Sequence, residues 1–98
     1  MRMLCRDLRY FVVLAEDPDL VRASLALGVS RATLTAAVKR LERAVEGRLL
    51  HRTRAGLSLT LAGHELLFYA HRMMSLHAEA LTSIRVATAA SAFDALRS

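Results

Sequence analysis

Cysteine, proline, glycine and aromatic residues are all scarce in this chain of 98 residues. The single cysteine, Cys5, excludes an intrachain disulfide and fits a protein of the reducing cytoplasm. One proline and four glycines leave few places where a helix must break, so we expect long helices. Tryptophan is absent and aromatic residues make up 5% of the chain, so its core must be built mainly from aliphatic side chains.

The sequence also lacks the patterns of an enzyme, a metal site or a membrane segment. It contains no Gly-rich phosphate loop and no nucleophile–base pattern, so we expect neither an enzyme nor a cofactor. No apolar run approaches the length of a membrane span, and charged residues interrupt the first ten positions, unlike a secretory signal. His64, His71 and His77 are not spaced i, i+4, and the only cysteine is remote in sequence, so no metal site is expected.

Positive charge, in contrast, is concentrated in one part of the chain. The whole chain has 14 basic and 9 acidic side chains and a net charge of +5. Residues 22–54 alone contain eight basic and two acidic side chains, so the rest of the chain is about neutral. A localised positive field favours a polyanionic partner such as nucleic acid.

Apolar spacing and stop signals predict two helices in the first third of the chain. Residues 7–16 place apolar side chains on one helix face. Pro18 ends this helix because proline has no backbone N–H to donate and disfavours helical geometry at the preceding residue. Asp19 is a suitable N-cap for a second helix over residues 20–27. The expected inward residues are Leu8, Phe11, Val12 and Ala15 in the first helix, and Leu20, Ala23, Ser24 and Leu27 in the second.

A short turn separates the second helix from a longer third one. Gly28 supplies the left-handed residue after the second helix, and Ser30 caps a helix over residues 31–45 that ends at Glu46-Gly47. This arrangement is a helix-turn-helix, which places its second helix in the major groove of DNA. The expected buried face of the third helix consists of Leu34, Ala37, Val38, Leu41 and Val45. The opposite face carries Ala32, Ala36, Lys39 and Arg43, with Arg40 and Thr35 on its flanks.

The remaining residues predict a hairpin and one long helix. Residues 48–53 and 57–59 are short extended segments on either side of a glycine-containing turn, and a hairpin in this position is a wing. Thr60 is the expected N-cap of a last helix that continues to at least Leu81.

An apolar stripe runs along this last helix, at alternating steps of four and three residues. We expect a second copy of the chain to cover the stripe, because so long and apolar a helix projects beyond a small domain. The alternative is a helix that packs back on its own domain. The residues assigned to the dimer interface are Leu66, Leu67, Ala70, Met73, Met74, His77, Leu81 and Ile84.

A series of ordered and regularly spaced residues extends from Leu8 to about Met74. These residues are Leu8-Arg-Tyr-Phe11, Ala15-Glu16, Arg22-Ala23, Leu27, Val29-Ser30, Leu34, Arg40-Leu41-Glu42, Gly47-x-Leu-Leu50, Arg52-Thr53 and Gly56-Leu-x-Leu-Thr60-x-Ala-Gly63. In order and spacing they resemble the N-terminal segment of LysR-type transcriptional regulators.

The resemblance implies a mainly α fold. Residues 1–59 would form a winged helix-turn-helix DNA-binding domain of three helices and a small β-hairpin, and residues 60–98 a long dimerisation linker helix with a C-terminal tail. It also implies a C-terminal effector-binding domain that this chain lacks, so an effector ligand is expected only where the full protein has that domain.

Several polar positions depart from the family pattern. Family members commonly carry Gln-Pro after the cap of the third helix and Ser-Arg-Gln one turn later, where this chain has Arg31-Ala32 and Thr35-Ala36-Ala37. The resemblance therefore supports the fold but not the family's usual choice of DNA sequence.

We expect the chain to bind double-stranded DNA sequence-specifically, as a dimer or a higher oligomer, and to regulate transcription. The alternative is a protein–protein interaction module of winged-helix fold that has lost specific DNA recognition. The residues expected at base edges are Arg31, Ala32, Thr35, Ala36 and Lys39. Those expected at phosphates are Arg22, Ser30, Thr33, Arg43, Arg52, Thr53 and Arg54.

Overall fold

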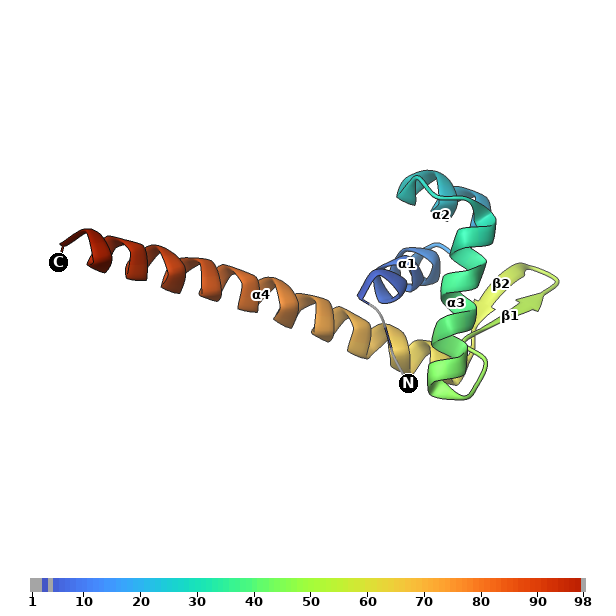
Figure 1. The fold of residues 1–98 in the computed structure, drawn as a ribbon. Coiled ribbons are helices and arrows are strands. Elements are labelled where there is room, and N and C mark those ends of the chain that lie inside the picture. Colours follow the sequence, from blue (N-terminus) through green and yellow to red (C-terminus); the bar gives the residue numbers. More distant parts are fainter. Residues whose placement is uncertain (1–2, 4, 98) are drawn as a thin grey trace.

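The computed structural model describes residue 3 and residues 5–97. Three helices and a two-stranded hairpin form a small body from which one long helix projects, so the longest dimension, 67 Å, is more than twice either of the others (Figure 1). In chain order the elements are α1 (Cys5–Glu16), α2 (Leu20–Leu27), α3 (Arg31–Val45), β1 (Leu50–Thr53), β2 (Gly56–Leu59) and α4 (Leu61–Arg97). The predicted winged helix-turn-helix with a long last helix is confirmed.

The helix ends follow the local signals in the sequence. The Asp19 carboxylate accepts a hydrogen bond from the Arg22 amide at 2.9 Å at the start of α2. Gly28 ends α2 in the left-handed region, with φ of 67°, and the Ser30 hydroxyl then accepts from the Thr33 amide at 3.0 Å. The left-handed residue that ends α3 is Glu46, with φ of 58°, rather than a glycine.

The limits of the hairpin differ from the prediction, because the first strand begins at Leu50 rather than residue 48 and the second begins at Gly56 rather than residue 57. Its strands pair antiparallel from Leu50 opposite Leu59 to Thr53 opposite Gly56, which leaves a two-residue loop. The first strand begins at Leu50 because the amide of the preceding Leu49 donates to the Glu42 side chain at 2.9 Å instead of joining the ladder.

One apolar core lies between α1, α2, α3 and the first turns of α4. Its largest fully buried apolar side chains are Phe11, Leu14, Leu34, Leu41 and Leu49. Val45, predicted to be buried, is 39% exposed. The chain reversal after α3 brings Leu49 back against that helix, and Leu49 fills the core at this end in its place.

The first third of α4 belongs to this core, whereas the rest does not. Leu66 and Ala70 are buried, and Leu67 and Met74 pack partly against the same cluster. From residue 75 to residue 97 every side chain on the helix is exposed. The apolar stripe therefore divides in two. Its first part packs on the domain of the same chain, as the alternative prediction had it, and its second part projects from the domain with its side chains exposed. Among residues 3 and 5–97, no helix is both long and apolar enough to span a membrane.

The Asp19 cap gives a prediction for pH dependence. The hydrogen bond from the Arg22 amide lowers the pKa of Asp19 from its ordinary value of 3.8. A lowered carboxyl pKa stabilises the fold above the unfolded-state value, and this contribution disappears as the pH falls through the folded-state value. Asp19→Asn keeps an oxygen acceptor but does not titrate, so we expect its deficit relative to the parent to be larger at pH 7 than at pH 3. Urea unfolding of both proteins at the two pH values measures the deficit, and an equal deficit would contradict this account.

Candidate nucleic-acid interface

A tight turn between α2 and α3 presents the N-terminal end of α3 to solvent. The Val29 amide donates to the Ser24 carbonyl at 3.1 Å, which fixes the turn, and Ser30 begins the next helix. The Ser30 hydroxyl also donates to the Thr33 hydroxyl at 2.9 Å. Both residues are exposed, so backbone amides and hydroxyls meet at the helix end where the dipole favours an anion.

The residues predicted to contact base edges lie along the accessible side of α3. Arg31, Ala32 and Lys39 are exposed, and Thr35 and Ala36 are half-buried. Thr35 and Lys39 line a groove between α3 and the hairpin. The structure therefore brings these residues together on one side of the helix.

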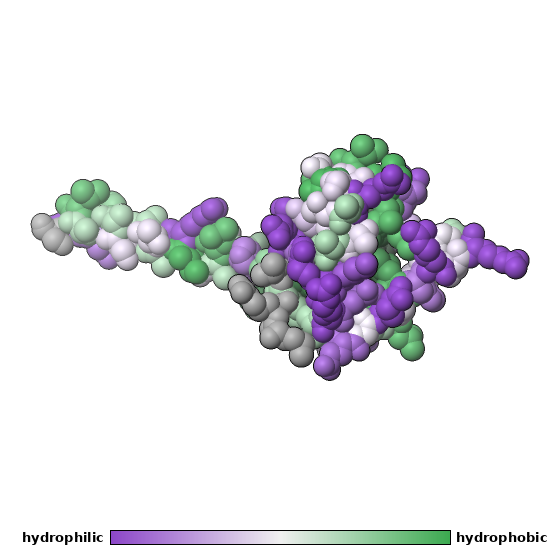
Figure 2. All heavy atoms as spheres, turned by 45° about the vertical axis from the view of Figure 1, so that its right-hand side comes forward, coloured by the Kyte–Doolittle hydropathy of each residue, from purple (hydrophilic) through white to green (hydrophobic). Residues whose placement is uncertain are grey.

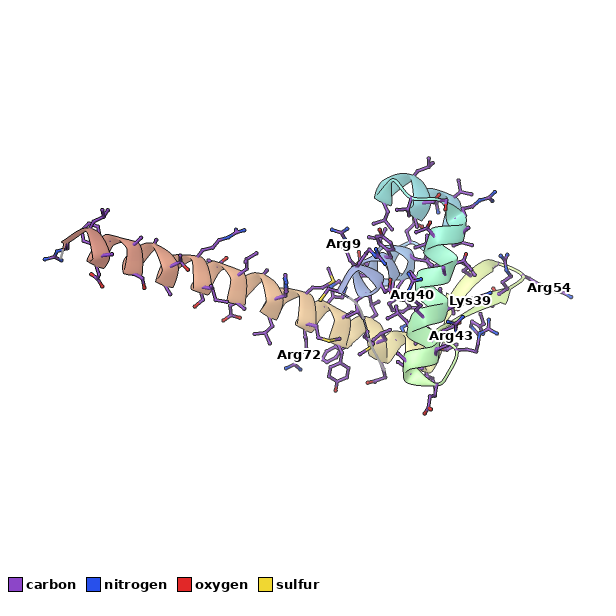
Figure 3. The ribbon with its side chains drawn as sticks, viewed as in Figure 1. Arg9, Lys39, Arg40, Arg43, Arg54 and Arg72 are labelled. Carbon is purple, nitrogen blue, oxygen red and sulfur yellow. The ribbon has the colours of Figure 1, made fainter. Side chains whose placement is uncertain are left out.

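Four cations form what we call the basic face: Lys39, Arg43, Arg52 and Arg54. All four are exposed. Figure 3 shows Lys39 and Arg43 on the side of α3 toward the hairpin and Arg54 extending from the hairpin tip. The space-filling view shows hydrophilic side chains gathered over α3 and the hairpin (Figure 2). This concentration of positive charge suits a polyanion.

Besides Ser30 and Thr33, two more residues predicted at phosphates have partners within the chain. The Arg22 guanidinium donates to Asp17 at 2.9 Å, and this hydrogen bond raises the pKa of Arg22. The Thr53 hydroxyl donates to the Gly56 carbonyl at 3.1 Å and accepts from the Ala55 amide at 3.2 Å. Thr53 thus stabilises the hairpin loop, while Arg22 lies among carboxylates that weaken its field.

Sequence reasoning missed a long-range ion pair beneath α3. The Arg40 guanidinium donates to the Asp7 carboxylate from Nε at 2.9 Å and from Nη2 at 3.0 Å. Asp7 is 1% exposed, and its hydrogen bonds raise the pKa of Arg40. Arg40 points toward α1, away from the basic face (Figure 3). The pair sets the position of α3 on α1 and removes Arg40 from the cations that could meet a ligand.

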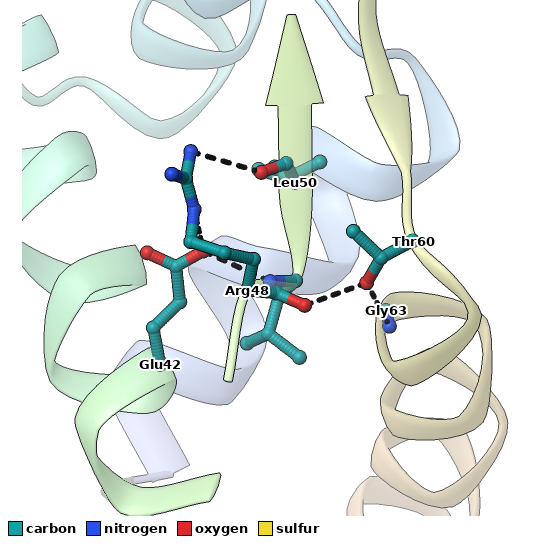
Figure 4. Close-up of polar contacts among 6 residues, drawn as sticks. Glu42, Arg48, Leu50, Thr60 and Gly63 are labelled. Atoms are coloured by element: carbon teal, nitrogen blue, oxygen red, sulfur yellow. Dashed lines mark hydrogen bonds and ion pairs between the residues drawn. The ribbon is translucent and has the colours of Figure 1, made fainter. Parts of the chain in front are cut away.

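A second polar network ties the hairpin to α3 and α4 (Figure 4). Glu42 accepts from the Leu49 amide at 2.9 Å and from Arg48 Nε at 3.3 Å. The Thr60 hydroxyl donates to the Arg48 carbonyl at 2.6 Å and accepts from the Gly63 amide at 3.0 Å. These bonds hold the wing at a fixed angle to α3, so the two parts of the basic face keep their separation.

The residues assigned to a dimer interface divide into two groups in the structure. Leu66 and Ala70 are covered by α1 of the same chain, which corrects their assignment, because a second copy cannot reach them without unpacking the core. An apolar stripe in the sequence does not distinguish a helix face covered by the same chain from one covered by a second copy. The remaining residues keep some exposed surface, most of all at the distal end: Leu67, Met73, Met74, His77, Leu81 and Ile84.

Residues 5–64 match the family model described as "Bacterial regulatory helix-turn-helix protein, lysR family". This chain belongs to the LysR family. It is 38% identical over 80 residues to the HTH-type transcriptional regulator YofA of Bacillus subtilis (strain 168). The aligned residues make up 82% of this chain and 28% of YofA. It is 39% identical over 83 residues to the HTH-type transcriptional regulator BudR of Klebsiella aerogenes. The aligned residues make up 85% of this chain and 58% of BudR.

Solved LysR-type structures share the fold. The DNA-binding domain of CbnR in complex with DNA has a TM-score of 0.83 and 34% identity, over 88% of this chain and 99% of that one. The DNA-binding domain of BenM with catB site 1 DNA has a TM-score of 0.79 and 28% identity, over 88% and 94% of the two chains. The chain spans only 28% and 26% of the first two curated relatives, YofA and DgdR of Burkholderia cepacia. These relatives are named transcriptional regulators, so the family is one of regulators and not of enzymes.

Proposed function

We propose that this LysR-family chain is the DNA-binding part of a transcriptional regulator and binds double-stranded DNA through α3 and the hairpin. The observation that carries the proposal is the basic face, which the fold places beside the accessible side of a helix-turn-helix. The matched structures of CbnR and BenM DNA-binding domains were solved with DNA, which supports the same role here. They also favour DNA binding over a protein–protein interaction module.

In the proposed complex, most of the affinity comes from phosphates. Arg52 and Arg54 on the hairpin and Arg43 on α3 would each neutralise a phosphate and release counterions. The exposed hydroxyls and amides at the start of α3 would add hydrogen bonds to the backbone of the duplex. These contacts would fix the orientation of α3 in the major groove.

Base recognition falls to fewer residues. Arg31 can donate two hydrogen bonds to guanine, and Thr35 can bond a base edge or contact a thymine methyl group. Ala32 and Ala36 have no side-chain donors, so their contribution is limited to apolar contact and close approach. We therefore propose modest specificity for one subunit, and a dimer would increase it by requiring two half-sites.

We propose that this dimer forms through the distal half of α4. Residues 1–59 and the first turns of α4 would then be the DNA-binding unit of each subunit. Leu81 and Ile84 are 42% and 61% exposed, and the helix on which they lie extends well beyond the core. Exposed apolar side chains along a protruding helix are stabilised when a second copy covers them.

A pair of charge substitutions tests this dimer. We expect Leu81→Glu with Ile84→Glu to shift the chain from dimer to monomer, because four carboxylates would enter the interface of each dimer. Thr82→Glu with Val86→Glu adds the same charge on the opposite side of the helix and should leave the dimer intact. Sedimentation velocity over a range of concentrations measures both, and equal behaviour of the two double variants would contradict the assignment.

Selection from random duplexes, followed by sequencing, tests the proposed function as a whole. We expect an enriched motif with twofold symmetry, whose half-sites lie about one helical turn apart or a multiple of it. Binding without any enriched motif would contradict sequence-specific recognition. An enriched motif that consists of a single half-site would contradict binding as a dimer.

The division between phosphates and bases gives a further prediction. We expect Arg52→Ala to weaken binding to all duplexes alike and to reduce the salt slope by about one, because it removes a phosphate contact. Thr35→Ala should instead change the preferred base at one position, at a cost of about 1–3 kcal/mol on the selected site. Titration of selected and scrambled duplexes separates the effects, and two variants that match the parent on every duplex would refute the site assignment.

A further inference from the structure

The first half of α4 has a second apolar face, on the side of the helix that points away from its own core. Its four large apolar side chains are between 51% and 87% exposed, whereas Leu66 and Ala70 on the other side are buried. Figure 3 shows Arg72, which lies among them, pointing away from α1. Neither the DNA contacts nor the dimer interface proposed above uses this surface. We call it the outer face of α4, and its residues are Leu61, Glu65, Phe68, Tyr69, Arg72 and Leu76.

The residues of the outer face form a pattern that is the same in both directions along the chain. They follow one another at steps of four, three, one, three and four residues, and steps of three and four return to one side of a helix. A leucine lies at each end, and two aromatic residues lie in the middle. The acidic and the basic residue lie between them, at equal distances from the centre. A face with this pattern is complementary to a second copy of itself that runs antiparallel to it.

The apolar side chains match in such a pair. A twofold axis between Phe68 and Tyr69 would place each Phe68 opposite the partner's Tyr69, and each Leu61 opposite the partner's Leu76. Within one chain the Phe68 and Tyr69 rings meet edge to face, with 5.1 Å between their centroids, so a compact aromatic step lies at the centre. Leu76 lies in a shallow hollow that the partner's Leu61 could enter as a knob enters a hole. The hollow is lined by His71, Arg72, Ser75, Leu76 and Glu79.

The charges on the outer face indicate that its partner is a second copy. Seven positions separate Glu65 from Arg72, roughly 10 Å along the helix axis, so the two side chains do not form a pair within the chain. No ion pair involves either of them within residues 3 and 5–97, and the Arg72 guanidinium lies over the Phe68 ring, 5.6 Å from its centroid. The same twofold axis would place each Glu65 opposite the partner's Arg72, so two ion pairs would cross the interface.

We propose that the outer face of α4 binds the outer face of a second copy, antiparallel and about this twofold axis. The contact is separate from the one through the distal half of α4, because it uses other residues on a different side of the helix. Exposed ion pairs add little affinity, so we expect this contact to be the weaker of the two and to form at higher protein concentration. A chain with both contacts can connect one dimer to the next.

Charge reversal tests the antiparallel pairing, in the full chain and without DNA. Every variant also carries Leu81→Glu and Ile84→Glu, so that the distal contact does not contribute, and we expect this background chain to dimerise at high concentration. Glu65→Arg and Arg72→Glu should each weaken the dimer at least about tenfold, because like charges then meet at two places. An equimolar mixture of the two variants should recover the affinity of the background chain, because opposite charges meet again at both places. Sedimentation velocity over a range of concentrations measures all four samples.

Arg85→Glu is the matched control, because it makes the same change of charge on an exposed part of α4 outside the outer face and should leave the association unchanged. Circular dichroism confirms that each variant folds. A background chain that stays monomeric up to its solubility limit would overturn the proposal, as would a dimer that neither single reversal weakens. Both results mean that another molecule, or none, covers the outer face. A mixture that associates no better than its components would also overturn it, because the two charges would then not meet across copies. DNA binding by the basic face is measured separately and does not depend on these outcomes.

Discussion

Replacing Arg40 with methionine is expected to destabilise the chain by about 1–3 kcal/mol, because the buried Asp7 carboxylate loses two hydrogen bonds and the nearer of its two cations, while Arg6 Nε stays 4.0 Å away. Asp7 is 1% exposed and accepts two hydrogen bonds from Arg40, which a methionine side chain cannot donate. Methionine keeps the length of the side chain, and the effect therefore reports charge rather than volume. Urea unfolding followed by circular dichroism measures the loss.

Three further variants isolate this ion pair. Lys39→Met removes an exposed neighbouring cation and should change stability by less than about 0.5 kcal/mol. Asp7→Asn should cost less than Arg40→Met, because the side chain of Arg40 is 38% exposed and can turn to solvent. Asp7→Leu combined with Arg40→Met should recover much of the loss, since two apolar residues leave no buried charge. Equal stabilities of Arg40→Met and Lys39→Met would show that the pair does not stabilise the fold.

Gly63→Ala is expected to destabilise the chain, although the same change within a free helix stabilises it by about 1 kcal/mol. A Cβ atom at Gly63 would overlap the Leu49 carbonyl oxygen and lie 3.2 Å from the carbonyl carbon and 3.1 Å from Leu59 Cδ2. The carbonyl oxygen also accepts from the Thr60 amide at 3.0 Å, so it cannot move away without losing that bond. Overpacking of this kind costs about 1–3 kcal/mol.

Gly47→Ala is the control for this prediction. Apart from Gly47 itself and its two chain neighbours, no residue comes within 4 Å of a Cβ built at Gly47, so alanine should be tolerated there. Thermal unfolding of the two variants compares them directly. A Gly63→Ala variant as stable as the parent or more stable would mean that α4 does not dock against the segment before β1 as closely as described.

Local signals were sufficient to predict most of the fold. The end of α1 before Pro18, the cap of α2 and the left-handed Gly28 each depend on a few adjacent residues, and the structure confirms them. The limits of the hairpin were predicted less well, because the start of β1 depends on a bond between the Leu49 amide and Glu42, seven residues away in sequence.

Contacts between distant segments were beyond this reasoning. Arg40 is 33 positions from Asp7, and no periodicity marks two residues of opposite charge as partners. An apolar stripe shows that a helix is covered but not by what, so Leu66 and Ala70 were assigned to a second copy when α1 covers them.

The central claim is that the basic face binds the phosphates of duplex DNA, and fluorescence anisotropy with a random-sequence duplex at several salt concentrations tests it most directly. Of the exposed cations of this face, Arg43, Arg52 and Arg54 are assigned to phosphates and Lys39 to a base edge. If each of the three arginines neutralises one phosphate, log K should fall with log salt with a slope of about −3 per subunit. No binding at low salt, or an affinity that does not change with salt, would contradict the claim.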